Sequence, residues 1–143
     1  MKKIFLLFLF FLISTNIVAQ TDNVFDARIY NREYQVYLHI NFYKNNIIIP
    51  EQELLGETPG YLGAKRDSRK WLITSVKIEN KYTATLEITN DYGSEDLTAT
   101  LIFNPKDGSY ILKQNTGSRI KIVENRKWVK LPTELKFVQE QNH

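Results

Sequence analysis

The chain of 143 residues contains no cysteine. Disulfide bonds, a lipid-modified cysteine and a cysteine nucleophile are therefore all excluded. The chain is still long enough for one domain to bury a hydrophobic core without cross-links. We expect a single domain over residues 20–143 that is held together by packing.

Histidine is almost as scarce, because the chain has only His39 and the terminal His143. A zinc site needs about three or four nitrogen, sulfur or carboxylate ligands, so the sequence predicts no metal site and no cofactor. The acidic turn with Asp91, Glu95 and Asp96 does not have the spacing of an EF-hand calcium loop. A glycine-rich phosphate loop and a nucleophile-elbow serine are also missing. We expect a protein that is not an enzyme, although a pair of catalytic carboxylates stays open as an alternative.

The charge of the chain is nearly balanced. It has 19 Lys and Arg against 16 Asp and Glu, and two of the lysines, Lys2 and Lys3, lie at the very start. Without these two the count is 17 against 16, a net charge of +1. A surface with that balance has no overall field that would gather nucleic acid or anionic lipid, so we expect no nucleic-acid partner.

The first nineteen residues have the layout of a secretory signal peptide. Two lysines precede an apolar run over residues 4–13, and a polar segment leads to Ala19. The run is too short for a membrane-spanning helix, which needs about 20 residues. We expect cleavage after Ala19, a periplasmic or extracellular location, and no stable membrane span after cleavage. An uncleaved membrane anchor is the alternative.

Side chains alternate between apolar and polar at every second position through much of the remaining chain, which is typical of strands. The clearest alternation predicts a strand over residues 33–44, with residues 24–30 as its hairpin partner. One face of the predicted strand carries Tyr34, Val36, Leu38, Ile40 and Phe42, and the other carries Gln35, Tyr37, His39, Asn41 and Tyr43.

The second half of the chain predicts a meander of short strands joined by tight turns. The predicted strands cover residues 70–79, 82–89, 97–103, 110–112, 119–123 and 128–131. In the first of them, Leu72, Thr74, Val76 and Ile78 are expected on one face. The tail after Pro132 fits the spacing of a helix and of a strand. The pattern predicts an all-β fold, an antiparallel meander that forms a small barrel or half-barrel, with a β-sandwich as the alternative.

Residues 50–69 interrupt this pattern and predict one long loop or a short helix. Pro50 suits a helix start and Gly56 a helix end, and the segment that follows has the composition of a loop. Most connections have about 4–6 residues. A connection as long as this one is either a binding loop or ordinary surface.

Two groups of residues are candidates for binding. The first is Tyr37, His39 and Tyr43 on the uncharged face of the predicted strand, because their rings can stack on a ligand and also form hydrogen bonds. The second is Arg66, Arg69 and Trp71 at the end of the long connection, because cations beside an indole can bind an anionic ligand or an acidic protein surface. Trp71 is expected in the core or at its rim.

These observations favour an exported, non-enzymatic binding domain for an envelope or extracellular protein, or for a small ligand. Three alternatives remain open. The chain is a lipocalin-like carrier of a small apolar molecule, an exported carboxylate-dependent hydrolase, or an inhibitor of the immunity-protein type. The oligomeric state does not follow from the sequence.

Overall fold

The computed structural model describes residues 22–140, which form a closed antiparallel β-barrel with two appended two-stranded sheets. The elements in chain order are β1 (Asp26–Asn31), β2 (Val36–Asn41), β3 (Ile47–Ile48), the 3₁₀ turn η2 (Glu53–Leu55), β4 (Glu57–Thr58), β5 (Gly60–Ala64), β6 (Asp67–Asn80), β7 (Thr83–Asn90), β8 (Asp96–Asn104), β9 (Ser109–Gly117), β10 (Lys121–Glu124), β11 (Lys127–Lys130) and β12 (Glu134–Gln139). The prediction of an all-β barrel is confirmed, and the sandwich alternative is not adopted.

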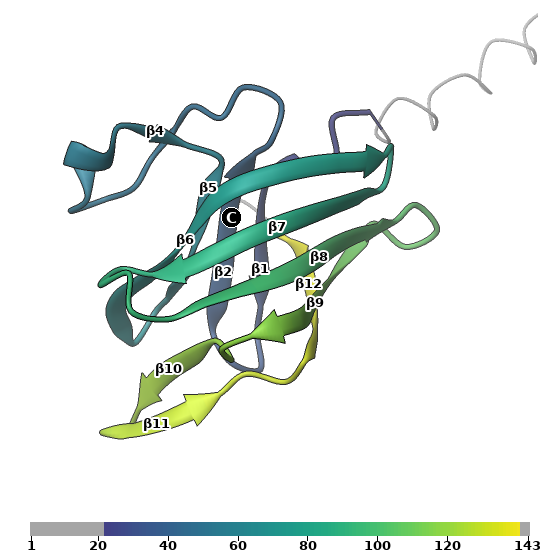
Figure 1. Ribbon diagram of the computed structural model, residues 1–143. Helices are drawn as coiled ribbons and strands as arrows, with labels where there is room; N and C mark the ends of the chain where they lie inside the picture. Colours follow the sequence, from purple (N-terminus) through teal and green to yellow (C-terminus); the bar gives the residue numbers. More distant parts are fainter. Residues whose placement is uncertain (1–21, 141–143) are drawn as a thin grey trace, which may run out of the picture.

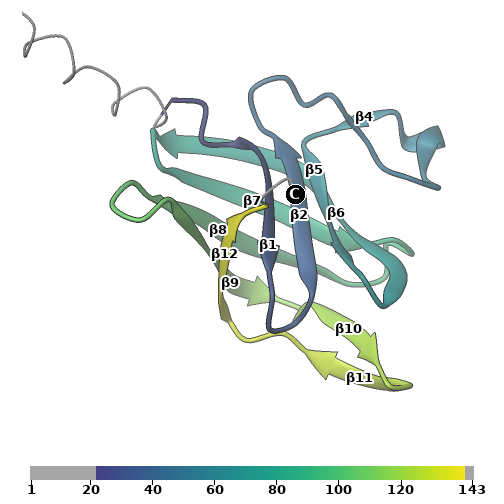
Figure 2. The same cartoon turned by 180° about the vertical axis from the view of Figure 1, so that it is seen from behind.

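Around the barrel the strands follow the order β1, β12, β9, β8, β7, β6, β5 and β2, and β2 pairs with β1 to complete the ring. Figures 1 and 2 show the barrel from opposite sides, with the β10–β11 hairpin projecting at the lower end. Within residues 22–140 the structure has no helix that is long and apolar enough to cross a membrane. The predicted signal peptide, residues 1–19, lies outside the described residues.

The predicted hairpin of the first two strands is present, but β2 is shorter than the alternation indicated. Gln35 has a φ of 54° and belongs to the turn before the strand. At the other end the side-chain oxygen of Asn41 accepts hydrogen bonds from the backbone N–H groups of Tyr43 and Lys44. Such an Asx turn redirects the chain, so the alternation ends at Asn41.

The strand predicted over residues 70–79 contains a β-bulge that the periodicity did not reveal. Ile73 pairs with Ile88 and Ser75 with Glu87, which leaves Thr74 as the extra residue. A bulge shifts the side-chain alternation by one position. Leu72 therefore faces outward, while Val76 packs against the core, so the prediction that they share one face is wrong.

The interior of the barrel is filled by apolar side chains from every barrel strand, and six buried aromatic residues belong to this cluster. These are Phe25, Phe42, Trp71, Phe103, Tyr110 and Phe137. Tyr110 is fully buried, and its hydroxyl donates a 2.7 Å hydrogen bond to the backbone oxygen of Val24. Side chains therefore occupy the space in which a carrier would hold its ligand.

Residues 50–69 do not form one loop. They contain η2, β4 and the complete barrel strand β5, which pairs with β2 and β6. The glycines that indicated a loop are required by close packing. A Cβ atom on Gly60 would meet the backbone oxygen of His39 and lie 2.9 Å from Ile40 Cα, and one on Gly63 would lie 2.5 Å from the ring of Tyr37.

The connection from β2 to β5, residues 42–59, lies on the outside of the barrel, and we call it the strap. Its Ile47 and Ile49 pack on Tyr61 and Leu72, which form a second apolar cluster on the outer face of β5 and β6. Burial of these side chains fixes the strap to the barrel wall.

We predict that Gly60→Ala lowers the free energy of unfolding by about 2–4 kcal/mol, because the new Cβ meets backbone atoms that side-chain movement cannot relieve. Gly93→Ala is the matched control, since Gly93 also has positive φ but open space around it; about 1 kcal/mol is expected there. Chemical denaturation of both variants measures the difference, and equal losses would contradict the close-packing argument.

Candidate functional site

The β10–β11 hairpin leaves the barrel between β9 and β12, and the buried amide of Gln114 holds its base closed. The Gln114 side-chain oxygen accepts from the Ile120 N–H at 2.8 Å, and its nitrogen donates to the Pro132 oxygen at 3.1 Å. The Leu131 N–H donates to the Ile120 oxygen at 2.8 Å. The two ends of the hairpin are thereby fixed to each other and to β9.

Two side chains of β6 attach the hairpin to the barrel wall. The indole N–H of Trp71 donates to the Lys121 oxygen at 3.0 Å, and the Val123 N–H donates to Asp67 Oδ2 at 3.1 Å. Asp67 is buried and also accepts from the Arg69 backbone N–H and from Arg69 Nη1, at 3.2 and 3.0 Å. Because hydrogen bonds to a buried carboxylate are strong, Asp67 connects the β5–β6 turn to β10.

Trp128 stands on the outer face of this anchored hairpin, opposite Val123, and 61% of its surface is exposed. The guanidinium carbon of Arg69 lies 4.9 Å from the centroid of the Trp128 ring system, and Lys121 Nζ lies 6.0 Å from it. Both distances are within the range of a cation–π interaction. An exposed indole is thus held in place by two cations.

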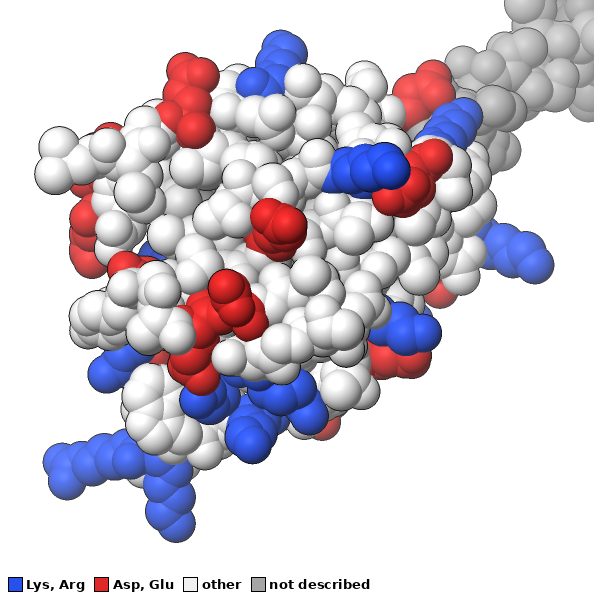
Figure 3. Space-filling model, viewed as in Figure 1, with Lys and Arg blue, Asp and Glu red and all other residues white. Residues whose placement is uncertain are grey.

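The hairpin is strongly basic. Residues 119–130 contain five cations, Arg119, Lys121, Arg126, Lys127 and Lys130, and one acid, Glu124, which gives a net charge of +4. In Figure 3 blue side chains gather at the lower end of the molecule, where Figure 1 shows the hairpin. The total charge of the chain is nearly neutral, but the electrostatic field around Trp128 is locally positive.

The structure brings two of the three residues predicted at the end of the long connection to this surface. Arg69 stacks on Trp128, and Arg66 lies beside the hairpin with its Nη1 3.7 Å from Glu124 Oε1. Trp71 is 5% exposed and lies in the core, as expected. From there its indole N–H donates a hydrogen bond to the backbone of the hairpin at Lys121.

Sequence reasoning missed Trp128. A local signal was present, because Arg126, Lys127 and Lys130 surround this tryptophan in the sequence. Its nearness to Arg69 was not visible, since that contact depends on how β10 and β11 dock on β6.

The other predicted group is divided by the fold. Tyr37 and His39 lie on the outer face of β2, each with its ring 5.9 Å from the ring of Tyr61. Burial, followed by the neighbouring Tyr37, raises the pKa of Tyr61 to about 12. Tyr43 lies beyond the turn at Asn41, and its hydroxyl accepts a 3.0 Å hydrogen bond from the Phe25 N–H. The three predicted residues therefore do not form one surface, and Tyr37 packs partly beneath the strap.

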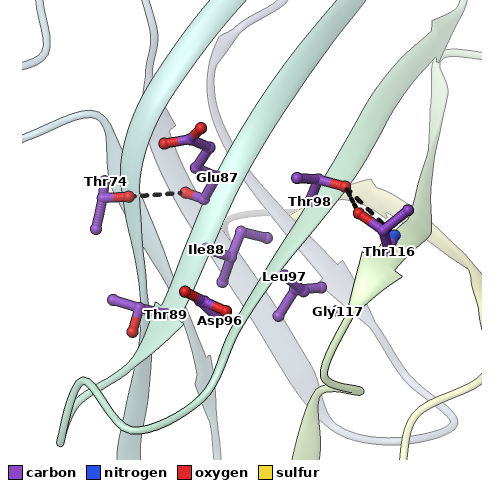
Figure 4. Close-up of a pocket in the computed structure, with 9 residues that line it drawn as sticks. All are labelled: Thr74, Glu87, Ile88, Thr89, Asp96, Leu97, Thr98, Thr116 and Gly117. Atoms are coloured by element: carbon purple, nitrogen blue, oxygen red, sulfur yellow. Dashed lines mark hydrogen bonds between the residues drawn. The ribbon is translucent and has the colours of Figure 1, made fainter.

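A shallow groove of about 330 Å³ on the outer face of β6 to β9 contains two carboxylates, Glu87 and Asp96 (Figure 4). The other polar groups there are mainly threonine hydroxyls, such as those of Thr98 and Thr116, which lie 2.6 Å apart. Glu87 extends away from Asp96 in Figure 4 and accepts a hydrogen bond from Ser75 at 2.9 Å. The two carboxylates point in different directions in Figure 4.

Among residues 22–140, no group of three or more His, Cys, Asp or Glu side chains is placed to hold a metal ion. The chain matches no protein-family model, no curated protein and no solved structure.

We predict that Asp67→Ala lowers the free energy of unfolding by about 2–3 kcal/mol, because three N–H groups lose a buried charged acceptor. It should also speed hydrogen exchange of the β10 amides, since the Val123 N–H loses its partner. The control Glu124→Ala removes only the exposed pair with Arg66 and is expected to cost less than about 0.5 kcal/mol. Denaturation with site-resolved hydrogen exchange tests both, and unchanged β10 exchange in Asp67→Ala would contradict the anchoring role.

His39 predicts a defined pH dependence of stability. Burial, and then the charge of Arg28, lowers the pKa of His39 below 6.5, while Asp26 acts weakly in the opposite direction. The unfolded chain therefore binds more protons once the pH falls below about 6.5. The contribution of His39 to stability is present above that pH and is lost as the pH falls through the lowered pKa.

We expect wild-type stability to decline between about pH 7.5 and pH 5.5, and His39→Gln to decline less. The difference between their denaturation midpoints removes the titrations that both proteins share. A wild-type protein that gains stability relative to His39→Gln on acidification would show that the pKa is raised instead.

Proposed function

We propose that this protein is an exported, non-catalytic binding domain that recognises a protein partner through the hairpin face around Trp128. The observation that carries the proposal is the exposed indole between Arg69 and Lys121 on a rigidly anchored hairpin. Tryptophan and arginine are enriched at the energetic centres of protein interfaces. Because the indole is already held in place, little side-chain freedom is lost on binding.

The charge of the hairpin specifies the chemistry of the partner. A net charge of +4 over residues 119–130 fits an acidic protein surface. A protein fits better than an anionic bilayer, because the nearby strap carries Glu51, Glu53 and Glu57 against the single cation Lys44, a net charge of −2. A negative membrane would repel that segment, whereas a folded partner can present charges of both signs.

The packed barrel interior gives no support to a carrier of small apolar molecules, and the divergent Glu87 and Asp96 give none to a carboxylate-dependent hydrolase. An inhibitor of another protein remains compatible with the proposal, because inhibition by binding requires the same kind of surface.

The test is affinity capture with the full-length chain, produced in its native host with its own first nineteen residues, followed by affinity measurement with the purified captured protein. We predict that Trp128→Ala weakens this binding by at least about tenfold, and that added salt weakens the wild-type interaction. Val138→Ser, on the outer face of β12, is the matched control because Val138 is 50% exposed.

Equal binding by wild type and Trp128→Ala, with both folded, would refute the assignment of the site. Binding of the purified chain to vesicles of anionic phospholipid, without any captured protein, would refute the choice of a protein partner.

A further inference from the structure

One side of the molecule carries two projections of opposite charge. The strap and the β10–β11 hairpin both extend to the left in Figure 1 and to the right in Figure 2, the strap above and the hairpin below. Residues 45–64 contain three acids and no cation, whereas residues 119–130 have five cations and one acid. The β7–β8 turn, residues 91–95, lies between the two projections.

A hydrogen bond and an ion pair connect these parts into a continuous edge. The Lys70 N–H donates to Asp91 Oδ2 at 3.3 Å, and Lys121 Nζ lies 2.8 Å from Glu95 Oε1. The β7–β8 turn is thus joined to the strand that carries Arg69 and to the base of the hairpin. The edge runs from the acidic strap, across this turn, to the basic hairpin.

Large apolar side chains are exposed along this edge. Leu54 is completely exposed at η2, Leu55 is 52% exposed, Tyr92 in the β7–β8 turn is 80% exposed, and Trp128 is exposed on the hairpin. Four of the nine large apolar side chains that are exposed in residues 22–140 therefore lie along this edge, and neighbouring exposed apolar groups of this kind indicate an interface.

The acidic end of the edge contains a groove. It has a volume of about 510 Å³ and lies between the strap and the β7–β8 turn, with Leu55, Pro59, Leu72 and Tyr92 among its lining residues. Glu57 and Asp91 also line it. A groove with apolar walls and carboxylates suits an aromatic side chain that is flanked by cations, and Trp128 with its neighbours has that chemistry.

We propose that a second copy of this chain occupies this groove, and that two copies associate about a two-fold axis with the strap of each against the hairpin of the other. The inference rests on the proposed function, because it uses the same hairpin face and makes the acidic strap of a second copy one of its partners. Under two-fold symmetry each contact occurs twice. An edge with opposite charges at its two ends is complementary to itself in that arrangement, while the parallel arrangement places like charges together.

Two variants, one with reversed charge in the strap and one with reversed charge in the hairpin, test this arrangement. The strap variant is Glu53→Lys with Glu57→Lys, and the hairpin variant is Arg126→Glu with Lys127→Glu and Lys130→Glu, which changes the net charge of residues 119–130 from +4 to −2; all five residues are exposed. Lys77→Glu with Lys106→Glu is the control, since both of these lysines are exposed and lie outside the strap and the hairpin. Sedimentation equilibrium at low and high salt measures the mass, and circular dichroism checks the fold.

We expect the wild type and the control to form dimers that dissociate in high salt. Each charge-reversed variant alone should associate at least about tenfold more weakly, because its strap and hairpin then carry the same sign. An equimolar mixture of the two variants should recover the dimer mass, since each strap again meets a hairpin of opposite charge.

A mixture that stays monomeric, or single variants that dimerise as well as the wild type, would overturn the proposal. Growth beyond a dimer would overturn the two-fold arrangement. If the wild type stays monomeric while Trp128→Ala still weakens binding to the captured partner, only this inference fails. If dimers form as expected and Trp128→Ala leaves partner binding unchanged, the proposed function fails instead.

Discussion

The pairing of the last strand with both β1 and β9 is the constraint on which the rest of the structure depends. Tyr30 pairs with Val138 on one side of β12, and Leu112 pairs with Leu135 on the other. This strand joins the first part of the chain to the last, and it does so in a protein without any cysteine. Closure leaves no unpaired barrel edge. It also fixes where the chain can leave the barrel, which is in the connections between paired strands.

Two of these connections, the strap and the β10–β11 hairpin, carry exposed apolar groups and net charges of opposite sign, and they are attached by different physical means. The strap is attached by burial, with Ile47 and Ile49 on the wall of the barrel. The hairpin is attached by buried hydrogen bonds to Gln114 and Asp67, and by the Trp71 indole. The packed barrel positions these surfaces, which is a common division between scaffold and loops.

Much of the fold could be predicted from period-two alternation, but contacts between distant segments could not. The strand β5 was missed because Gly60 and Gly63 indicate a loop, while in the structure they make room for the His39–Ile40 backbone and the Tyr37 ring. The prediction that Leu72 and Val76 share one face failed because Thr74 is an extra residue in a bulge. The amino-acid composition of the strand does not show such a bulge. For the candidate site, Arg69 was identified and Trp128 was not, because their contact requires β10 to dock on β6.

The hydrogen bond from the Trp71 indole to the Lys121 oxygen has a kinetic consequence. It joins the β10–β11 hairpin directly to a residue of the barrel interior. We therefore expect the hairpin to move slowly and with small amplitude, like the core, rather than with the fast motion of a free loop. A partner would then meet a nearly fixed shape, and its arrival need not wait for a rare conformer. Differences in lifetime between complexes formed at this surface would arise mainly from how well each partner fits it.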